Sequence, residues 1–85
     1  MEIICSPLFL KKYKKLLIEI KELAEKKEII FRKDPFSPQL KTYRLHGKFK
    51  GTYSFSINYE YRIIFEIKEK QIFIFLLAGK HNIYK

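Results

Sequence analysis

The sequence contains one cysteine, three glycines, three prolines and no tryptophan. A single cysteine cannot form an internal disulfide, which excludes the small disulfide-stabilised scaffolds of secreted proteins. Because Cys5 stands among apolar residues, we interpret it as a small buried side chain in a reducing compartment. One cysteine and two histidines without close spacing are too few ligands for a zinc site. We therefore expect no metal and no other cofactor.

Long hydrophobic runs are also missing. No apolar stretch approaches the roughly 20 residues that a membrane-spanning helix needs, so no membrane partner is expected. The first fifteen residues, MEIICSPLFLKKYKK, carry their positive charges after a broken apolar stretch, whereas a secretory signal carries them before one. Both observations favour a cytoplasmic protein.

Acidic residues are scarce. The chain has 18 Lys and Arg against 9 Asp and Glu, for a net charge of +9. Residues 1–40 hold nine basic and six acidic side chains, while residues 41–85 hold nine and three. The positive charge is thus less neutralised in the second half of the chain. A positive electrostatic field favours a polyanionic partner, either nucleic acid or an acidic protein segment.

The length of 85 residues suits one domain, which we place at residues 1–85. The apolar fraction is 47% and the aromatic fraction 16%, so the chain has enough apolar surface to fold. A core of this size is marginal, and each apolar face has to be used.

The first part of the chain predicts a strand followed by helical structure. Residues 2–5 are a short apolar strand candidate. Ser6 and Pro7 read as a helix N-cap and first helical position. The helical period then continues to about Ile30, with a break near Lys15 that would give either two helices or one kinked helix.

One face of this helical segment is apolar and is expected to pack on the core. On the solvent side, Glu22 and Lys26 have the spacing of an i,i+4 ion pair. The apolar stripe comprises Tyr13, Leu16, Ile20, Leu23 and Ala24.

The period changes from helical to alternating after a proline-containing loop at Arg32–Gln39. Four strand candidates follow, the first ending at Gly47 and the last running from Ile72 until the apolar run stops at Gly79. Between them, 58–60 and 68–70 read as tight turns. Helices followed by a run of strands predict an α+β fold: an N-terminal strand, two helices or one kinked helix, then a mainly antiparallel twisted sheet with the helices on one face.

Arg62 stands in the middle of an otherwise apolar strand. Alternation places it with Ser54, Ser56 and Glu66 on the sheet face opposite the helices. A charge at such a position is costly unless it has a partner or reaches solvent. Two interpretations stay open: an ion pair with Glu60 or Glu66, or a guanidinium that presents its fork to a phosphate.

Three sequence elements, in this order and spacing, resemble the RelE/ParE superfamily of toxins from bacterial toxin–antitoxin modules. The resemblance covers nearly the whole chain, since the order of strand, helices and sheet also fits. The elements are a Leu-x-Gly-x-x-x-Gly pattern (Leu45, Gly47, Gly51), the Tyr-Arg-Ile-Ile-Phe strand at 61–65, and a terminal Gly-x-His-x-x-Tyr at 79–84.

The resemblance implies a type II toxin that inhibits translation as a ribosome-dependent mRNA endonuclease, a metal-independent hydrolase-class enzyme of the RelE, YoeB and YafQ kind. It implies that Arg62 contacts the scissile phosphate, that His81 lies near the leaving group, and that Tyr84 orients or stacks on the substrate. The residues expected to bind RNA are Lys48, Lys50, Ser54, Ser56 and Lys80.

These residue types suit attack by the RNA's own 2′-hydroxyl. The reaction needs a base for the 2′-OH proton, a proton donor for the departing 5′-oxygen and a cation at the phosphorane. A histidine that titrates near pH ~6.5 can donate or accept a proton. An aromatic ring can stack on an unpaired base.

The general base is the part that the resemblance does not supply. Ser54 and Ser56 stand where RelE carries two lysines, and Tyr43 where YoeB has a glutamate and YafQ a histidine. His46, Glu60 and Tyr43 are the candidates. The gap keeps an alternative open: a ParE-like inhibitor of DNA gyrase, which shares the fold and cuts no RNA.

The resemblance also implies the partners. A cognate antitoxin is expected to wrap the toxin, and an acidic amphipathic segment would suit a surface of +9 and compete with RNA for it. The ribosome and its mRNA are the other expected partners.

Overall fold

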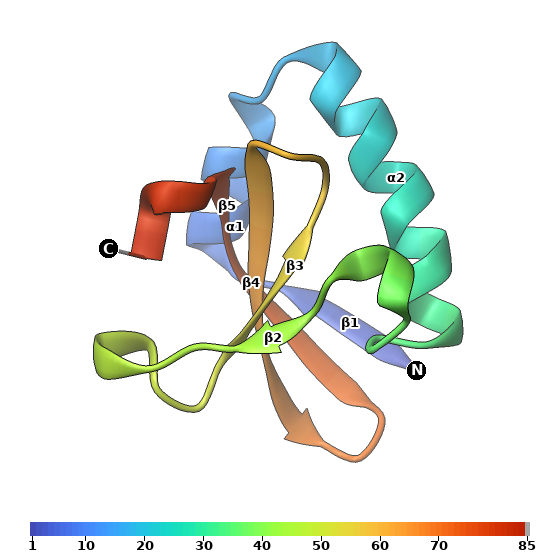
Figure 1. The fold of residues 1–85 in the computed structure, drawn as a ribbon, viewed down its shortest axis with the longest axis vertical. Helices are drawn as coiled ribbons and strands as arrows, with labels where there is room; N and C mark the ends of the chain where they lie inside the picture. Colours follow the sequence, from blue (N-terminus) through green and yellow to red (C-terminus); the bar gives the residue numbers. More distant parts are fainter. Residues whose placement is uncertain (85) are drawn as a thin grey trace.

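The computed structural model describes residues 1–84 of the chain and the side chains of residues 1–82. A strand, two helices and four further strands follow one another, with short 3₁₀ helices between and after them (Figure 1). The strands are β1 (Glu2–Cys5), β2 (Tyr43–Arg44), β3 (Tyr53–Ser56), β4 (Tyr61–Glu69) and β5 (Ile72–Lys80). The helices are α1 (Pro7–Lys14) and α2 (Ile18–Lys33), with 3₁₀ turns η1 (Pro38–Leu40), η2 (Gly47–Phe49) and η3 (His81–Tyr84).

The helical segment begins and breaks where its sequence indicates. Ser6 caps α1, its Oγ accepting a 3.0 Å hydrogen bond from the backbone N–H of Phe9, and Pro7 occupies the first turn. The chain leaves the helix at Lys15, so the prediction of two helices is confirmed and that of one kinked helix is wrong. The second helix continues to Lys33, three residues past the expected end at Ile30.

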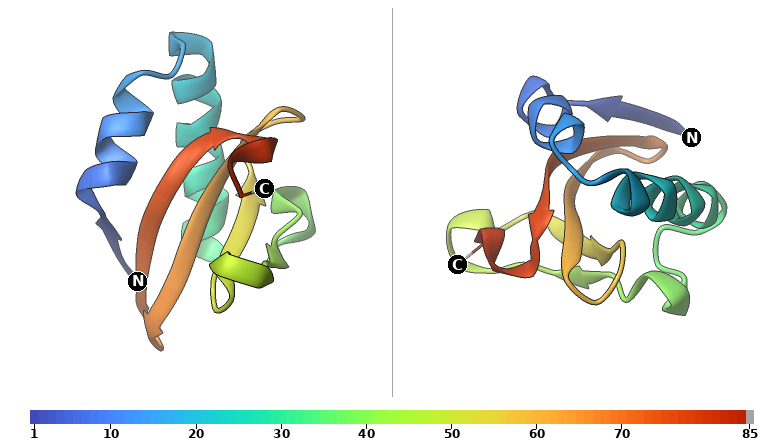
Figure 2. Two further views of the ribbon diagram at one scale, coloured as in Figure 1. Left: turned by 90° about the vertical axis from the view of Figure 1, so that its left-hand side faces the viewer. Right: turned by 90° about the horizontal axis from the view of Figure 1, so that it is seen from above.

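The five strands form one sheet in the order β1-β5-β4-β3-β2. Strand β1 pairs with β5 in parallel, and the other three pairings are antiparallel. The sheet is strongly twisted, and both α helices lie against one of its faces (Figure 2). The predicted α+β architecture, with helices on one face of a mainly antiparallel sheet, is therefore confirmed.

Phe31 is the centre of the core between helices and sheet. Its side chain is 0% exposed, and its ring centroid lies 4.9–5.4 Å from those of Phe55, Phe65, Phe73 and Phe75. Three of these ring pairs are edge-to-face, the arrangement that the ring quadrupole favours. The predicted stripe stopped at Ala24 and did not include this residue, although it lies two turns further along the same face.

The opposite sheet face has a smaller apolar layer of its own. Ile64 and Leu45 are buried although neither belongs to the core cluster under the helices. The chain between β2 and β3, with η2 at its tip, lies on this side of the sheet (Figure 2). Gly47 and Gly51, at the two ends of that tip, have φ values of 69° and 91°, which explains the glycines of the Leu-x-Gly-x-x-x-Gly pattern.

Several predicted boundaries and contacts differ in the structure. The strand expected to end at Gly47 is only Tyr43–Arg44, because the chain turns into η2. The last strand passes through Gly79 and ends at Lys80, paired with Tyr61 on β4.

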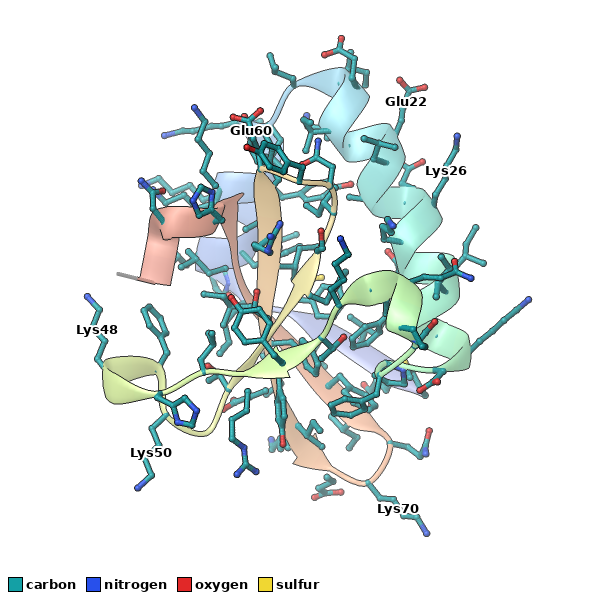
Figure 3. All side chains as sticks on the ribbon, viewed as in Figure 1. Glu22, Lys26, Lys48, Lys50, Glu60 and Lys70 are labelled. Carbon is teal, nitrogen blue, oxygen red and sulfur yellow. The ribbon has the colours of Figure 1, made fainter. Side chains whose placement is uncertain are left out.

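Two predicted side-chain environments on the helix side are wrong as well. Cys5 is exposed rather than buried, because β1 is an edge strand. Within residues 1–82 the ion pair on α2 is Glu28–Arg32, with 2.9 Å between Oε2 and Nε, and not Glu22–Lys26. Figure 3 shows Glu22 and Lys26 projecting from the outer side of that helix. No helix in the described part of the chain combines the length and apolarity needed to cross a membrane.

Candidate functional site

Arg62 lies at the start of β4, on the sheet face away from the helices. Its neighbours across the ladder are Ser56 on β3 and Gly79 on β5. The side chain is half-buried, and its Nη1 donates to the carbonyl oxygens of Asn58 at 2.6 Å, Tyr61 at 3.2 Å and Tyr59 at 3.3 Å. Within residues 1–82 no carboxylate lies within ion-pair distance of Arg62, so the carbonyls of a turn take the place of the predicted Glu60 or Glu66.

The turn that Arg62 holds joins β3 to β4. The side-chain Oδ1 of Asn58 accepts hydrogen bonds of 2.9 Å from the backbone N–H groups of both Glu60 and Tyr61. The hydroxyl of Ser56 donates to the Asn58 carbonyl oxygen at 2.6 Å. Side chains therefore fix this turn from both sides. Asparagine suits position 58 because its side-chain oxygen can accept hydrogen bonds from the backbone N–H groups that follow it.

His81 is attached to the same turn. Its backbone N–H donates a 2.7 Å hydrogen bond to the carbonyl oxygen of Glu60, and its side chain is exposed. It follows Gly79, the cross-strand partner of Arg62, by two residues. The structure thus brings Arg62, Glu60 and His81 to one end of the sheet, where η3 begins.

Two of the predicted RNA-binding lysines, Lys48 and Lys50, lie at the other end of the sheet. Lys48 and Lys50 project from the η2 tip, whereas Glu60 stands at the far end of β4 (Figure 3). His46 lines a shallow cavity of about 410 Å³ with Arg44 and Lys50. His46 is therefore separated from Arg62 by most of the length of β3.

The remaining candidates on this face are mixed in exposure. Tyr43 is exposed and pairs across the ladder with Ser54. Ser54 is 0% exposed, and its Oγ has no hydrogen-bond partner among the described residues. Ser56 is also buried, with its hydroxyl used by the turn. RNA contact through either serine would need the covering chain to move.

The terminal residues complete the set. Lys80 is exposed and pairs across the ladder with Tyr61. The backbone of Tyr84 belongs to η3, but its side chain lies outside the described residues.

Two residues of the site were not found from the sequence. Asn58 organises the β3–β4 turn, and the Asn at the first position of a tight turn was a signal that could have found it. Tyr59, at the tip of that turn, is 90% exposed. Nothing in the alternating pattern distinguishes it from Tyr61 or Tyr53, which pack against the core.

The opposite face of the sheet has a separate cavity of about 220 Å³ between the two helices, lined by Cys5, Tyr13, Glu25 and Glu28 among others. Partial burial raises the pKa of Cys5 above its ordinary value, and the charge of Glu28 raises it further. Burial also raises the pKa of Tyr13. The described residues contain no cluster of three His, Cys, Asp or Glu side chains that could hold a metal ion.

Comparison with known proteins gives matches in structure alone. No protein-family model matches the chain, and no curated protein sequence matches it. A copper-bound mutant toxin from Helicobacter pylori superposes with a TM-score of 0.77 at 24% identity, covering 95% of this chain and 94% of that one. A YoeB/ParE toxin from Agrobacterium tumefaciens gives 0.78 at 18% identity, covering 95% and 99%. The RelE–RelB complex of Pyrococcus horikoshii gives 0.75 at 14% identity, covering 95% and 94%.

The chain therefore has the fold of the RelE/ParE toxins over nearly its whole length. The resemblance noticed in the sequence is confirmed at the level of the fold.

Proposed function

We propose that this protein is the toxin of a type II toxin–antitoxin module and a ribosome-dependent mRNA endonuclease. The observation that carries the proposal is the junction of β4, β5 and η3. There Arg62 lies across from Gly79, a residue without a side chain, and His81 is held to Glu60 through its backbone. A cation and an exposed imidazole at one end of the sheet are two of the three groups that attack by a 2′-hydroxyl requires.

The chemistry at this junction is an internal transesterification. The 2′-oxygen of the message forms a bond to phosphorus, and the bond from phosphorus to the 5′-oxygen breaks, leaving a 2′,3′-cyclic phosphate and a 5′-hydroxyl. Arg62 stabilises the added negative charge of the phosphorane, using guanidinium nitrogens other than Nη1, which holds the turn. His81 gives a proton to the departing 5′-oxygen.

Glu60 is the candidate base that the fold favours by position. It shares the β3–β4 turn with the groups that Arg62 binds, and its carbonyl oxygen anchors His81. His46 lies at the opposite end of the sheet, beside Lys50. Tyr43 is on the correct face, across from Ser54, and is the second choice. The Tyr84 ring remains a proposed stacking surface.

Partners and location follow from the same proposal. One of the superposed toxins is seen in a RelE–RelB complex, which supports an antitoxin partner for this chain. With a net charge of +9, the partner segment is proposed to be acidic and to compete with RNA. The single domain, residues 1–85, would act on ribosomes in the cytoplasm, with Lys48, Lys50 and Lys80 against RNA.

A second candidate function is a ParE-like inhibitor of DNA gyrase. The observation that favours it is the engagement of Arg62: Nη1 is committed to backbone carbonyls of the turn, as a purely structural arginine would be. On that account the arginine shapes the turn and no RNA is cut.

Induced expression with mapping of RNA 5′ ends separates the two candidates. The proposed function predicts new 5′ ends within translated messages, which disappear when translation initiation is blocked. Purified DNA gyrase, assayed for supercoiling in parallel, should be unaffected. Inhibited supercoiling without new 5′ ends would overturn the nuclease proposal in favour of the gyrase inhibitor.

A further inference from the structure

Tyr59 is the most exposed of the large apolar or aromatic side chains that the structure describes. It is 90% exposed, and it stands at the tip of the β3–β4 turn rather than on a helix surface. Scattered exposed apolar residues are ordinary in soluble proteins and need no explanation. The setting of Tyr59 is what requires one.

The backbone beneath Tyr59 is fixed on each side. Asn58 accepts two backbone N–H groups through Oδ1, and its carbonyl oxygen accepts from Ser56 and Arg62. The carbonyl oxygen of Tyr59 itself accepts from Arg62 at 3.3 Å. Ile57, which enters the turn, is fully buried in the core. A ring on so constrained a backbone loses little entropy when a flat ligand stacks on it.

The turn and the strand ends beside it carry two cations, Arg62 and Lys80, and one carboxylate, Glu60. Arg62 binds the turn from below, and Lys80 is exposed across the ladder from Tyr61. The backbone N–H of His81 donates a hydrogen bond to the carbonyl oxygen of Glu60, the residue after Tyr59 and the one carboxylate residue of the turn. An exposed aromatic ring beside positive charges is the combination that binds single-stranded nucleic acid, where rings stack on bases and cations contact phosphates.

We infer that Tyr59 is a stacking platform for an unpaired RNA base next to the Arg62–His81 junction. The inference rests on the proposed function for its ligand, RNA, and adds a specific contact to it. The platform holds a nucleotide adjoining the scissile phosphate, so Tyr59 is a binding residue and takes no part in proton transfer. Its effect should appear in affinity and in KM rather than in kcat.

The test measures binding of a short fluorescein-labelled single-stranded RNA whose 2′-hydroxyls are methylated, which prevents cleavage by 2′-OH attack. Tyr59→Ala should weaken binding about tenfold, since stacking accounts for that order of affinity per base. Tyr59→Phe keeps the ring and should bind like the parent. Ile29→Ala, which truncates a side chain 61% exposed on α2, is the matched control and should change nothing.

Two further comparisons make the assignment specific to stacking. In a plot of log affinity against log salt, Tyr59→Ala should shift the line without changing its slope, because no phosphate contact is lost. With an abasic version of the same oligonucleotide, the parent and Tyr59→Ala should bind equally.

The result that overturns the inference is an unchanged affinity of Tyr59→Ala while the parent binds the RNA. That result would reject the stacking role of Tyr59 and leave the proposed nuclease function unaffected. If Tyr59→Ala relieves growth arrest but binds the RNA like the parent, Tyr59 contacts a protein and the inference is wrong. If the parent binds no RNA and cuts no message, the proposed function has failed along with it.

Discussion

Arg62 donates a hydrogen bond of 2.6 Å from Nη1 to the carbonyl oxygen of Asn58, four residues before it in the chain. The bond ties the first part of β4 to the turn that precedes it. With Nη1 holding the turn, the other guanidinium nitrogens are left for the proposed phosphate contact, so on this proposal the arginine has two separable roles.

These two roles predict different results for two substitutions. Arg62→Ala should abolish growth arrest and lower the free energy of unfolding by about 1–2 kcal/mol, the usual effect of removing a charged hydrogen-bond donor. Arg62→Lys keeps the charge but not the fork, so it should recover stability better than activity. Urea unfolding and a growth assay measure the two quantities. Full activity in a folded Arg62→Ala protein would remove Arg62 from the catalytic site.

Phe31 should be the most sensitive position of the core. Its ring contacts four other phenylalanines, so Phe31→Ala should cost about 3–5 kcal/mol. Because that loss approaches the whole stability of a small domain, Phe31→Leu provides a milder test, expected at roughly 1–3 kcal/mol. Phe36→Ala, at a half-exposed ring, is the control and should cost about 1 kcal/mol or less. Equal effects at the two positions would contradict the described core.

The sequence was informative about the fold because its local signals agree with one another. The helix start at Ser6 depends on a capping hydrogen bond to Phe9, only three residues further along the chain. It can therefore be predicted without knowledge of the tertiary structure. Alternation correctly places Ser54 and Ser56 on the sheet face opposite the helices, since their neighbours Tyr53, Phe55 and Ile57 pack in the core under the helices. The positive φ values of Gly47 and Gly51 explain the two glycines of the Leu-x-Gly-x-x-x-Gly pattern, for which the resemblance gave no physical reason.

The parts that the sequence did not predict depend on contacts between distant residues. Strand β5 continues past Gly79 because Tyr61 and Arg62 pair with it, and no local pattern indicates that. Similarly, one of the two interpretations of Arg62 pairs it with Glu60 or Glu66, yet it binds carbonyl oxygens. Those oxygens converge only once the β3–β4 turn has formed. Cys5 was expected to be buried from its apolar neighbours, but its strand lies at a sheet edge.

Lys48 and Lys50 should contribute to RNA affinity through charge alone. If each contacts one phosphate, replacing both by Gln should reduce the slope of log affinity against log salt by about 1.4. The double variant Lys26→Gln, Lys70→Gln removes the same charge from sites away from η2, as Figure 3 shows, and should leave the slope nearly unchanged. An unaltered slope in the first variant would exclude the η2 tip from the RNA surface.

The residues after β5 should be needed for cleavage and not for folding. Ending the chain after Lys80 preserves the whole strand and removes the hydrogen bond from the backbone N–H of His81 to the carbonyl oxygen of Glu60. The truncated protein should keep a cooperative unfolding transition and lose nuclease activity. Removing Lys80 as well would take away a residue paired with Tyr61, so the cut belongs after it.

His81→Gln separates the imidazole from the rest of that segment. The amide can still form hydrogen bonds, but it cannot protonate a leaving oxygen. Single-turnover cleavage should therefore fall by about a hundredfold or more, while ribosome binding stays unchanged. The residual cleavage rate should lack the pH dependence that a histidine contributes. Cleavage at the parent rate would show that His81 is not the acid.

The most direct test of the account is primer extension on one message in a purified translation system, with and without the protein. The account predicts 5′ ends within the codon in the ribosomal A site, only when ribosomes are translating. It also predicts a 2′,3′-cyclic phosphate on the upstream fragment and no such ends with Arg62→Ala. An intact message in the presence of folded parent protein, together with inhibition of purified gyrase, would contradict it.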